Sequence, residues 1–435
     1  MKKGPLTIDS PKTEIEILNI LTQDNNMSAL FIKDMNPEFF STPRNRIIMR
    51  AIKTYFDKYN GVPTETALND IINKVSEKRQ GKNMIVPADI SNTIAEVYTK
   101  KEYKKHQISY YEEEIEKFIK MNKMRQAFLN NVDNMDDITK FNEIEQAFKE
   151  AALWTPDKNI GIEIQQVEER YRKINEVFEN FVPLPFKNIS KAIGGGMLPK
   201  SLTYVAAQSG LGKSIMLDEI AFFCWKELGM NVVVASCELS EEVKSLRIDA
   251  QFVNRTTNEL VKDHSGVEKA YKALGPKNNF LFIKEFPASS TNSRMISSYI
   301  HRLKSFYDMD IGLIVVDYAD IVIPNSYKRN SLYQDGGDVA EELRYLGYEW
   351  NCPVVSATQI KREGTDIAIE ELNRTHIAES HKKFNTVDSM IGVAAMPSER
   401  ASGILYAKTL KARHGQENII IPLQVQYEFL KITEA

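Results

Sequence analysis

One run of eight residues carries the residue types of a phosphate-binding loop. It reads Ala207-Gln208-Ser209-Gly210-Leu211-Gly212-Lys213-Ser214 and stands between an apolar run that predicts a strand and a helical stretch from Ile215 to Leu228. In such a loop the backbone N–H groups and the start of the helix face phosphate oxygens. We expect Lys213 to reach the β- and γ-phosphates of ATP and the Ser214 hydroxyl to hold Mg²⁺. Ala207 takes the place of the usual first glycine.

Three further polar residues follow apolar runs that predict buried strands. Asp317 closes one run, where its carboxylate can bind the Mg²⁺ of a nucleotide. The next residue is Tyr318 rather than an acid, so the group that activates water must come from another element. Glu238, after a second run, is the candidate for that role, and a cap on the following helix is the alternative. Gln359 ends a third run, where its amide can contact the γ-phosphate and respond to its loss.

Two basic residues, Lys411 and Arg413, begin a predicted turn between two strand-like segments near the C-terminus. We do not expect this turn to reach the phosphate loop of its own chain. In a ring it can reach the nucleotide of the next subunit, where Arg413 would stabilise negative charge in the transition state. A solvated basic turn is the alternative.

The apolar runs that position these residues are short and do not alternate with polar residues. They span Leu202–Ala207, Val232–Ala235, Phe280–Ile283, Leu313–Val316 and Pro353–Ala357, and helical stretches separate several of them. Strands buried on both faces show this pattern, and helices between them favour a mostly parallel α/β sheet. Near the C-terminus, the segments Ile404–Leu410 and Asn418–Tyr427 predict a hairpin.

The first part of the chain predicts helices instead of strands. Apolar or amphipathic helical patterns cover Ile15–Leu21, Arg44–Tyr59, a stretch from Thr64, Ile90–Val132 and Asn142–Leu153. The last two can fold back on one another as a helical hairpin.

A linker and an isolated helix separate these two parts. Turn-forming residues run from Thr155 to Gly161, and a helix is predicted over Glu163–Phe181. Its apolar residues form a narrow seam of Ile164, Val167, Tyr171, Ile174 and Phe178. The seam can pack on its own domain or on a neighbouring subunit, and the pattern favours neither. We therefore divide the chain into an all-α domain (1–155), a linker with its helix (156–185) and an α/β domain (186–435).

Composition excludes several classes of protein. The chain has 435 residues and a formal net charge of −3, which does not indicate bulk electrostatic binding of nucleic acid but leaves room for a local basic channel. No apolar run approaches the ~18 residues of a spanning helix, and no signal-peptide core follows the N-terminus, so we expect no membrane partner. Three cysteines (Cys224, Cys237 and Cys352) are too few for a disulfide framework, and we expect them to be buried in a cytoplasmic protein.

In their order along the chain, these motifs resemble those of the DnaB-type replicative DNA helicases, most closely the branch found in large tailed phages of the T-even type. The resemblance is carried by Gly196-Met197-Leu198-Pro199, the phosphate loop with its alanine, Ser236–Val243 around Glu238, Arg247–Ala250, Asp317-Tyr318, Gln359, Lys411 with Arg413 and Gly415, and Phe39–Arg46. It covers essentially the whole chain and is more specific after residue 186 than before residue 150.

The resemblance implies a RecA-like motor domain behind a helical collar, in a homohexameric ring whose linker helix docks on the neighbour. The motor would hydrolyse ATP with Mg²⁺ and move 5′→3′ on single-stranded DNA to unwind a replication fork. It also implies a primase and a helicase loader as partners, and a phage protein that acts in the cytoplasm of a bacterial host.

Two loops are candidates for contacts with DNA. DnaB-type helicases carry an Arg-Glu-Ser-Gly stretch in a channel loop, and the matching residues here are Ala378-Glu379-Ser380-His381, without the Arg and the Gly. We expect Glu379 and Ser380 to take part and Lys382 and Lys383 to supply the positive charge. The second candidate is the loop from Pro324 to Gly337, with Lys328 and Arg329. A solvated loop is the alternative for each basic pair.

Two other functions share the phosphate loop and the glutamate. One is a RecA-like recombinase that coats DNA as a filament, and the other is a RecA-like ATPase of a primosome that does not unwind DNA. The helical N-terminal part and the isolated linker helix favour the helicase.

Overall fold

The computed structural model describes residues 11–77, 88–99, 108–156, 161–325, 332–360, 367–377 and 381–435. The chain forms two compact units, Met1–Ile162 and Glu163–Ala435. Among the helices within these ranges, none combines the length and the apolar character needed to cross a membrane.

The first unit is built from helices, as predicted. They are α1 (Pro11–Gln23), α2 (Asn25–Phe31), α3 (Pro43–Tyr59), α4 (Glu65–Glu77), α5 (Ala88–Thr99), α6 (Ile108–Asn131) and α7 (Phe141–Leu153). The predicted helix over Ile90–Val132 is described as α5 and α6. Capping residues explain two of the starts: the Asp24 carboxylate accepts backbone hydrogen bonds at the start of α2, and Thr42 does so before Pro43 of α3. The core of this unit comes mainly from α1, α3, α5 and α6.

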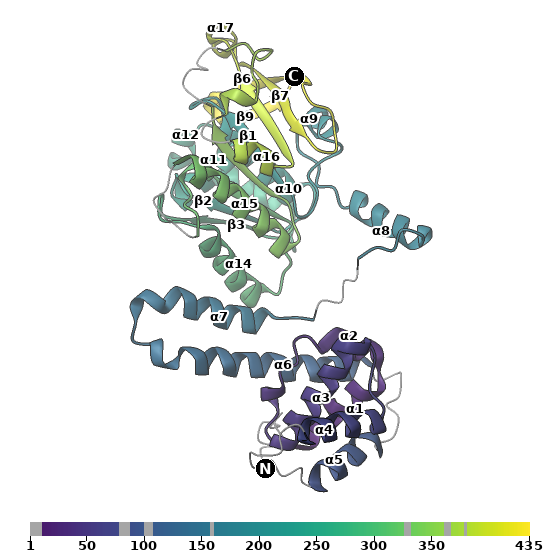
Figure 1. Ribbon diagram of the computed structural model, residues 1–435. Coiled ribbons are helices and arrows are strands. Elements are labelled where there is room, and N and C mark those ends of the chain that lie inside the picture. The colour runs from purple at the N-terminus through teal and green to yellow at the C-terminus, as the bar shows by residue number, and fades with distance from the viewer. Residues whose placement is uncertain are drawn as a thin grey trace. The chain divides into compact units, whose positions relative to one another are not determined.

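The two long helices α6 and α7 lie side by side and antiparallel (Figure 1). This is the predicted hairpin. Several apolar side chains near its closed end are exposed, among them Phe128, Leu129 and Phe141.

A nine-stranded sheet forms the centre of the second unit. Its strands are β1 (Leu202–Ala207), β2 (Val232–Ser236), β3 (Leu281–Glu285), β4 (Leu313–Asp317), β5 (Val354–Gln359), β6 (Ser389–Ala394), β7 (Ile404–Ala412), β8 (Ile420–Gln426) and β9 (Lys431–Glu434). Their order is β3-β2-β4-β5-β1-β6-β7-β8-β9. The strands from β3 to β6 in this order are parallel, and β7, β8 and β9 are added antiparallel. The predicted α/β fold with a mostly parallel sheet is confirmed.

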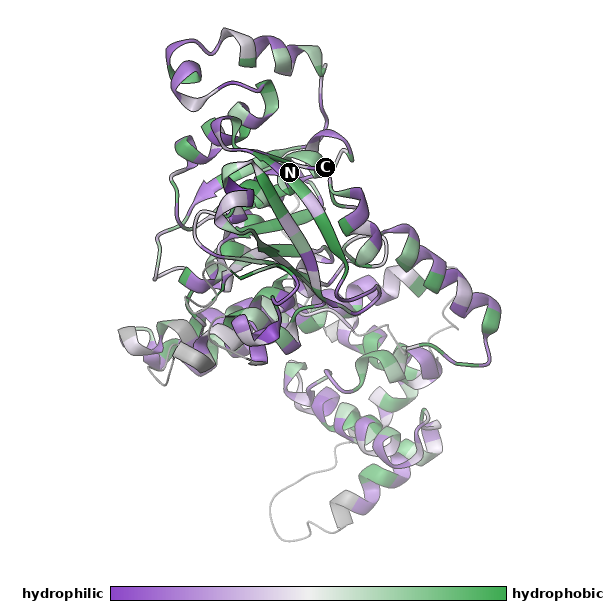
Figure 2. Cartoon of the chain, turned by 90° about the horizontal axis from the view of Figure 1, so that it is seen from above, coloured by the Kyte–Doolittle hydropathy of each residue, from purple (hydrophilic) through white to green (hydrophobic). Residues whose placement is uncertain are grey.

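Helices cover both faces of this sheet and thereby bury its central strands on both sides. The helices of the unit are α8 (Val167–Glu179), α9 (Lys187–Ala192), α10 (Lys213–Lys226), α11 (Glu241–Val253), α12 (Thr257–Lys262), α13 (Ser265–Ala273), α14 (Ser293–Tyr307), α15 (Leu332–Trp350), α16 (His381–Thr386) and α17 (Pro397–Ala401). Alternate residues of each strand point to opposite faces. Val205 and Ala207 of β1 pack with α10, whereas Tyr204 and Ala206 belong to the cluster that includes α14 and α15. Figure 2 shows the central strands coloured as hydrophobic.

The linker helix α8 is shorter than predicted and begins at Val167 instead of Glu163. All of its residues are described, and none of them is buried. Val167, Tyr171 and Phe178 of the predicted seam are 51%, 54% and 52% exposed. The seam therefore leaves a largely uncovered apolar face in the single chain.

Candidate active site

The phosphate-loop segment follows the carboxyl end of β1 and opens α10. Its two glycines, Gly210 and Gly212, have φ angles of 79° and 82°, in the left-handed region that favours glycine. A Cβ on Gly212 would also lie 2.7 Å from the terminal methyl group of Ile432, which can shift, so the positive φ angle is the main reason for glycine there. The start of α10 is thus shaped as an anion-binding helix terminus.

Lys213, the first residue of α10, turns back over this loop. Its Nζ donates to the backbone oxygens of Ala207 (3.2 Å) and Gln208 (3.0 Å). Burial lowers the pKa of Lys213, while the carboxylates of Asp320, Glu238 and Asp317 act in the opposite direction. The loop therefore holds an ammonium group among three acids, where a nucleotide would place its phosphates.

Ser214 and Asp317 meet beside Lys213. The Ser214 hydroxyl donates to Oδ1 of Asp317 across 3.1 Å, and Asp317 is the last residue of the central strand β4. A hydroxyl and a carboxylate are the hard oxygen donors that Mg²⁺ takes when substrate phosphates complete its shell. The residues at this position therefore fit the predicted metal.

A buried ion cluster, which the sequence did not predict, lies behind Asp317. Lys244 of α11 contacts Oδ2 of Asp317 and, at 2.6 Å, Oδ1 of Asp218 in α10. The side chains of all three residues are at most 1% exposed. Asp218 stands among apolar neighbours in α10, including Ile215, Ala221 and Phe222, and this mismatch is a signal that could have found it. The residues one helical turn from Lys244 are mostly polar, so the sequence gives no such signal for the lysine.

Glu238 follows β2, whose last residue, Ser236, is aligned with Asp317 of β4. Its side chain is exposed, and its charge acts on Lys213. The sequence left open whether Glu238 caps the next helix. The side chain of Ser240 makes that cap by accepting from the backbone N–H of Val243 at 3.3 Å. In the sheet, β4 and β5 lie between β2 and β1, the strand that leads into the phosphate loop.

Gln359 ends β5, directly beside the last residue of β1, Ala207. Its side-chain amide donates to the hydroxyl of Tyr318 (3.2 Å), and its backbone N–H donates to Asp320 (2.7 Å). Asp320 also accepts from Thr358 of β5 at 2.9 Å. The end of the Gln359 strand is thus tied to the turn that follows Asp317.

Lys411 and Arg413 lie at the other end of the sheet. Lys411 is inside β7 rather than in the turn, and its Nζ donates to the backbone oxygens of Phe384 and Asn385. Burial and the nearby Arg413 lower the pKa of Lys411. Arg413 donates to Asn385 O at 3.2 Å and forms an ion pair with Asp388 at 3.3 Å.

The strand register fixes how far this pair lies from the phosphate loop. Ala412 is aligned with Ser389 of β6, and Ser389 is aligned with Thr203, near the start of β1. The phosphate loop begins after Ala207, at the opposite end of β1. Four residues of strand, roughly 13 Å, separate the two positions along the sheet.

Comparisons with known proteins agree with this arrangement. Residues 182–380 match the family described as the DnaB-like helicase C terminal domain. This part of the chain is therefore similar to the DnaB-like helicases. The chain is also similar to a DnaB-like replicative helicase of Enterobacteria phage T4, with 24% identity over 408 residues that cover 88% of this chain and 82% of the relative. A replicative DNA helicase DnaB of Synechocystis sp. is 26% identical over 174 residues, which are 39% of this chain but only 20% of that protein.

Two solved structures share the fold. One is a DnaB-like replicative helicase studied for its interactions with primase, which has a TM-score of 0.56 and 15% identity and covers 97% of this chain and 98% of its own. The other is the ATPase domain of another protein, with a TM-score of 0.54 and 15% identity over 64% of this chain and all of that domain. The predicted resemblance to the DnaB-type replicative helicases is confirmed, and so is the enzyme class that it implies, a replicative DNA helicase.

The candidate DNA loops of this DnaB-like domain are only partly described. Lys328, Arg329, Glu379 and Ser380 lie outside the described residues, so their predicted roles stay predictions. The predicted loop from Pro324 to Gly337 is corrected in part, because α15 already begins at Leu332.

The adjacent lysines Lys382 and Lys383, which we expect to supply positive charge to DNA, differ in their exposure and in their partners. Lys382 is 41% exposed and forms ion pairs with Asp338 (2.5 Å) and Glu341 (3.0 Å) of α15. Lys383 is 1% exposed, and its Nζ lies 2.7 Å from Oδ1 of Asp320. Lys383 is therefore corrected to an internal residue of the DnaB-like domain, whose charge Asp320 balances, and it is not carried forward as a contact to DNA.

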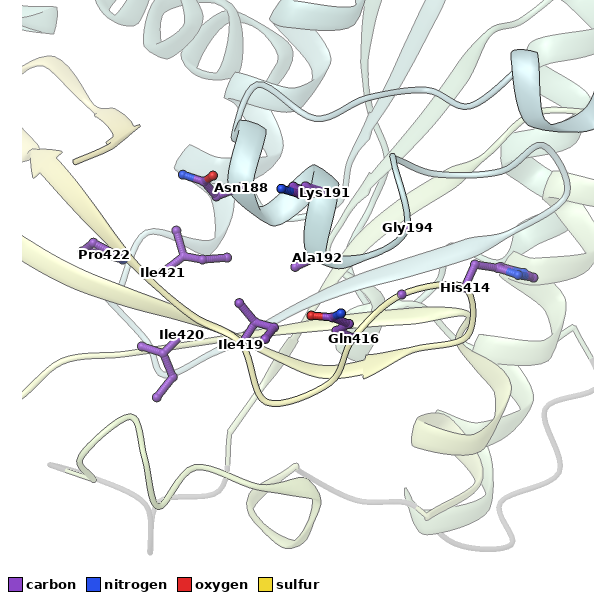
Figure 3. Close-up of a pocket in the computed structure, with 11 residues that line it drawn as sticks. Asn188, Lys191, Ala192, Gly194, His414, Gln416, Ile419, Ile420, Ile421 and Pro422 are labelled. Carbon is purple, nitrogen blue, oxygen red and sulfur yellow. The ribbon is translucent and has the colours of Figure 1, made fainter.

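A cavity of about 620 Å³ lies next to the Arg413 turn of this domain (Figure 3). Its wall is formed by α9 and by the turn and strand after Arg413, including Lys191, Ala192, His414, Gln416, Ile419 and Ile421. The cavity thus borders the turn that follows Arg413.

Proposed function

We propose that the protein is an ATP-driven replicative helicase that assembles as a homohexameric ring and moves 5′→3′ on single-stranded DNA to unwind a replication fork. One observation carries the ring: the phosphate loop and the Lys411–Arg413 pair lie at opposite ends of the same sheet. If Lys411 and Arg413 act on a nucleotide, this layout lets them reach the one bound to a second copy of the chain, and head-to-tail contacts that close make a ring.

Residues of one subunit would bind ATP and activate the attacking water. Lys213 and the N–H groups of residues 208–214 would bind the β- and γ-phosphates of ATP, while Ser214 and Asp317 hold Mg²⁺. When bound, Mg²⁺ supplies positive charge that offsets the charge developing on the phosphates. Glu238 would orient the attacking water and accept its proton, since its carboxylate is exposed and acts on Lys213.

Gln359 and the neighbouring subunit would complete the cycle. Gln359 stands beside the phosphate loop, where its amide could contact the γ-phosphate and detect its loss. Lys411 and Arg413 would enter the site from the next subunit and stabilise the transition state. Each hydrolysis event would then release the DNA held by one subunit.

The linker would hold the ring together. In the proposed division, residues 1–155 form a collar, residues 156–185 the linker and residues 186–435 the motor. The exposed seam of α8 is proposed to dock on the motor of the neighbour, since an uncovered apolar face gains free energy by burial.

The proposed partners are single-stranded DNA, a primase and a helicase loader. Phage and bacterial replicative helicases among the relatives support DNA, and one fold relative was studied with primase. We place the activity in the cytoplasm of a bacterial host, on the similarity to the phage T4 protein.

A strand-displacement assay tests polarity and unwinding together. Forked duplexes with only a 5′ tail, only a 3′ tail or both tails would be incubated with protein, ATP and Mg²⁺. We expect displacement that requires the 5′ tail and is lost in Lys213→Ala. Displacement that requires the 3′ tail, or none on any fork by an ATPase-active protein, would refute the proposal.

The two alternative functions predict other assemblies. A recombinase would form filaments along DNA with ATP, and a non-unwinding primosome ATPase would form rings but leave forks intact. Electron micrographs with ATP therefore separate a filament from a ring, and the fork assay separates the two rings.

A further inference from the structure

Lys244 is a fully buried lysine that pairs with two acids from two different elements. It stands on α11, 2.6 Å from Asp218 of α10 and 2.5 Å from Asp317 at the end of β4. Burial alone would lower the pKa of Lys244, but the two carboxylates outweigh it and raise the pKa. The lysine is therefore a fixed positive charge in a dry part of the molecule.

The two oxygens of Asp317 have different partners. Oδ2 accepts from Lys244, and Oδ1 accepts from the hydroxyl of Ser214 at 3.1 Å. A carboxylate held by one oxygen in this way cannot rotate freely, so the other oxygen stays directed at Ser214. This is the side on which the proposed metal and the phosphates lie.

Asp218 pairs with Lys244 and balances its charge. It contacts Lys244 through Oδ1, and Arg247 lies 3.9 Å from Oδ2. Lys244 and Asp218 together carry no net charge, so their pair adds little to the electrostatic field at the metal position. What the pair can contribute is the orientation of Asp317.

We propose that Lys244, anchored by Asp218, is a positioning residue that holds the Asp317 carboxylate toward the metal and thereby sets the Mg²⁺ dependence of nucleotide binding. The inference rests on the proposed function only in taking Asp317 as a metal ligand. Groups that orient a metal ligand from behind contribute roughly 10- to 100-fold to metal affinity.

The test removes the pair without changing the net charge of the cluster. The double variant Lys244→Met with Asp218→Asn keeps similar volumes, removes one positive and one negative charge, and leaves Asp317 with its contact to Ser214 only. Binding of a fluorescent ATP analogue would be titrated with Mg²⁺, and binding without Mg²⁺ would be measured in parallel. We expect the half-saturating Mg²⁺ concentration to rise about 10-fold or more, with metal-free binding unchanged.

Two control variants show whether a change in the Mg²⁺ titration comes from the Asp317 carboxylate. Lys284→Met removes a partly exposed lysine of β3 that pairs with Glu241 of α11, the helix that also carries Lys244, and it should leave the Mg²⁺ titration unchanged. Asp317→Asn removes the proposed ligand itself. If Asp317→Asn does not alter the titration, the metal assignment fails, whereas a shift in Asp317→Asn without one in the double variant refutes the positioning role alone.

A milder variant covers the case in which the double variant does not fold. Asp218→Asn removes the charged anchor of Lys244, so the ammonium group should be held less firmly in place and should orient the Asp317 carboxylate less well. We expect a smaller rise in the Mg²⁺ requirement, in the same direction. An unchanged requirement in a folded Asp218→Asn protein would overturn the proposal.

Discussion

Replacing Arg413 with alanine tests the ring, because the structure separates this residue from the phosphate loop of its own chain. About four residues of strand, roughly 13 Å, lie between the start of the Arg413 turn and the end of β1. The variant should still fold, since Asp388 keeps its contacts with Arg344 and with the backbone N–H of Leu202. It should also bind ATP, since its phosphate loop is unchanged.

Turnover by Arg413→Ala should fall by roughly 10³-fold or more, the scale of a missing arginine finger. Lys213→Ala should be inactive for a different reason, because it lacks the charge that binds the phosphates. In a mixture of equal amounts, about a quarter of the interfaces would pair an intact loop with an intact finger. ATPase activity should therefore recover to about a quarter of that of the unmodified protein if the interfaces act independently.

The mixing experiment needs proof that the two proteins share rings. One variant would carry a tag, and a pull-down would confirm that the other comes with it. A mixed ring without recovered ATPase activity would show that Arg413 does not act across the interface. Normal turnover in Arg413→Ala alone would show that it is a basic turn residue without a catalytic role.

Three other expectations follow from single sites. Glu238→Gln should bind ATP and hydrolyse it about 10²-fold more slowly in a steady-state assay, and loss of binding would instead make Glu238 structural. Ile174→Asp should dissociate the ring in sedimentation because a charge in a dry contact costs several kcal/mol, while Asn175→Asp on the same helix should not. Burial raises the pKa of Glu219 from 4.5 to about 7, so its contribution to stability falls as the pH rises between these values. Glu219→Gln should therefore stabilise the protein against urea by up to about 3 kcal/mol at pH 8.5, with little gain near pH 4.5.

Much of the sheet could be predicted because its central strands are buried on both faces. The run Leu202–Ala207 became β1 at the same bounds, since continuous apolar residues need cover on both sides. Two strands were missed. β6 begins with Ser389 and contains Gly392, and neither residue type is typical of a strand. The glycine is explained only by the structure, where Leu372 and Leu410 pack closely against it. The four residues of β9 are too few to show a pattern.

The part of the candidate site that could be predicted is the part whose residues are close together in the sequence. Residues 207–214 place loop, lysine and hydroxyl together through local geometry alone. The Lys244 cluster depends on three elements, and Asp317 is 73 residues from Lys244 along the chain. Such a pairing follows from the order of strands and helices in space, which a single sequence does not contain.

The two lysines of α16 show how local patterns fail. Two adjacent lysines in a sequence suggest one basic patch, yet the side chains of consecutive residues in a helix point about 100° apart. Lys382 faces α15 and is partly exposed, and Lys383 points inward to Asp320. Two neighbouring lysines of one helix therefore differ in exposure, and the acid that pairs with Lys383 lies 63 residues away along the chain.

The segment that follows β4 is held by lysines from two sides. Lys244 fixes Asp317 at its start, and Lys383 fixes Asp320 three residues later. Asp320 in turn accepts the backbone N–H of Gln359. Because unpaired charges inside a protein are costly, neither acid can leave its lysine without a strong penalty. Asp317, which is proposed to hold the metal, lies at the start of this segment, and Gln359, which is proposed to contact the γ-phosphate, is hydrogen-bonded to it. The positions of both residues thus depend on buried ion pairs, and an enzyme needs such fixed positions where it places charge against a phosphate.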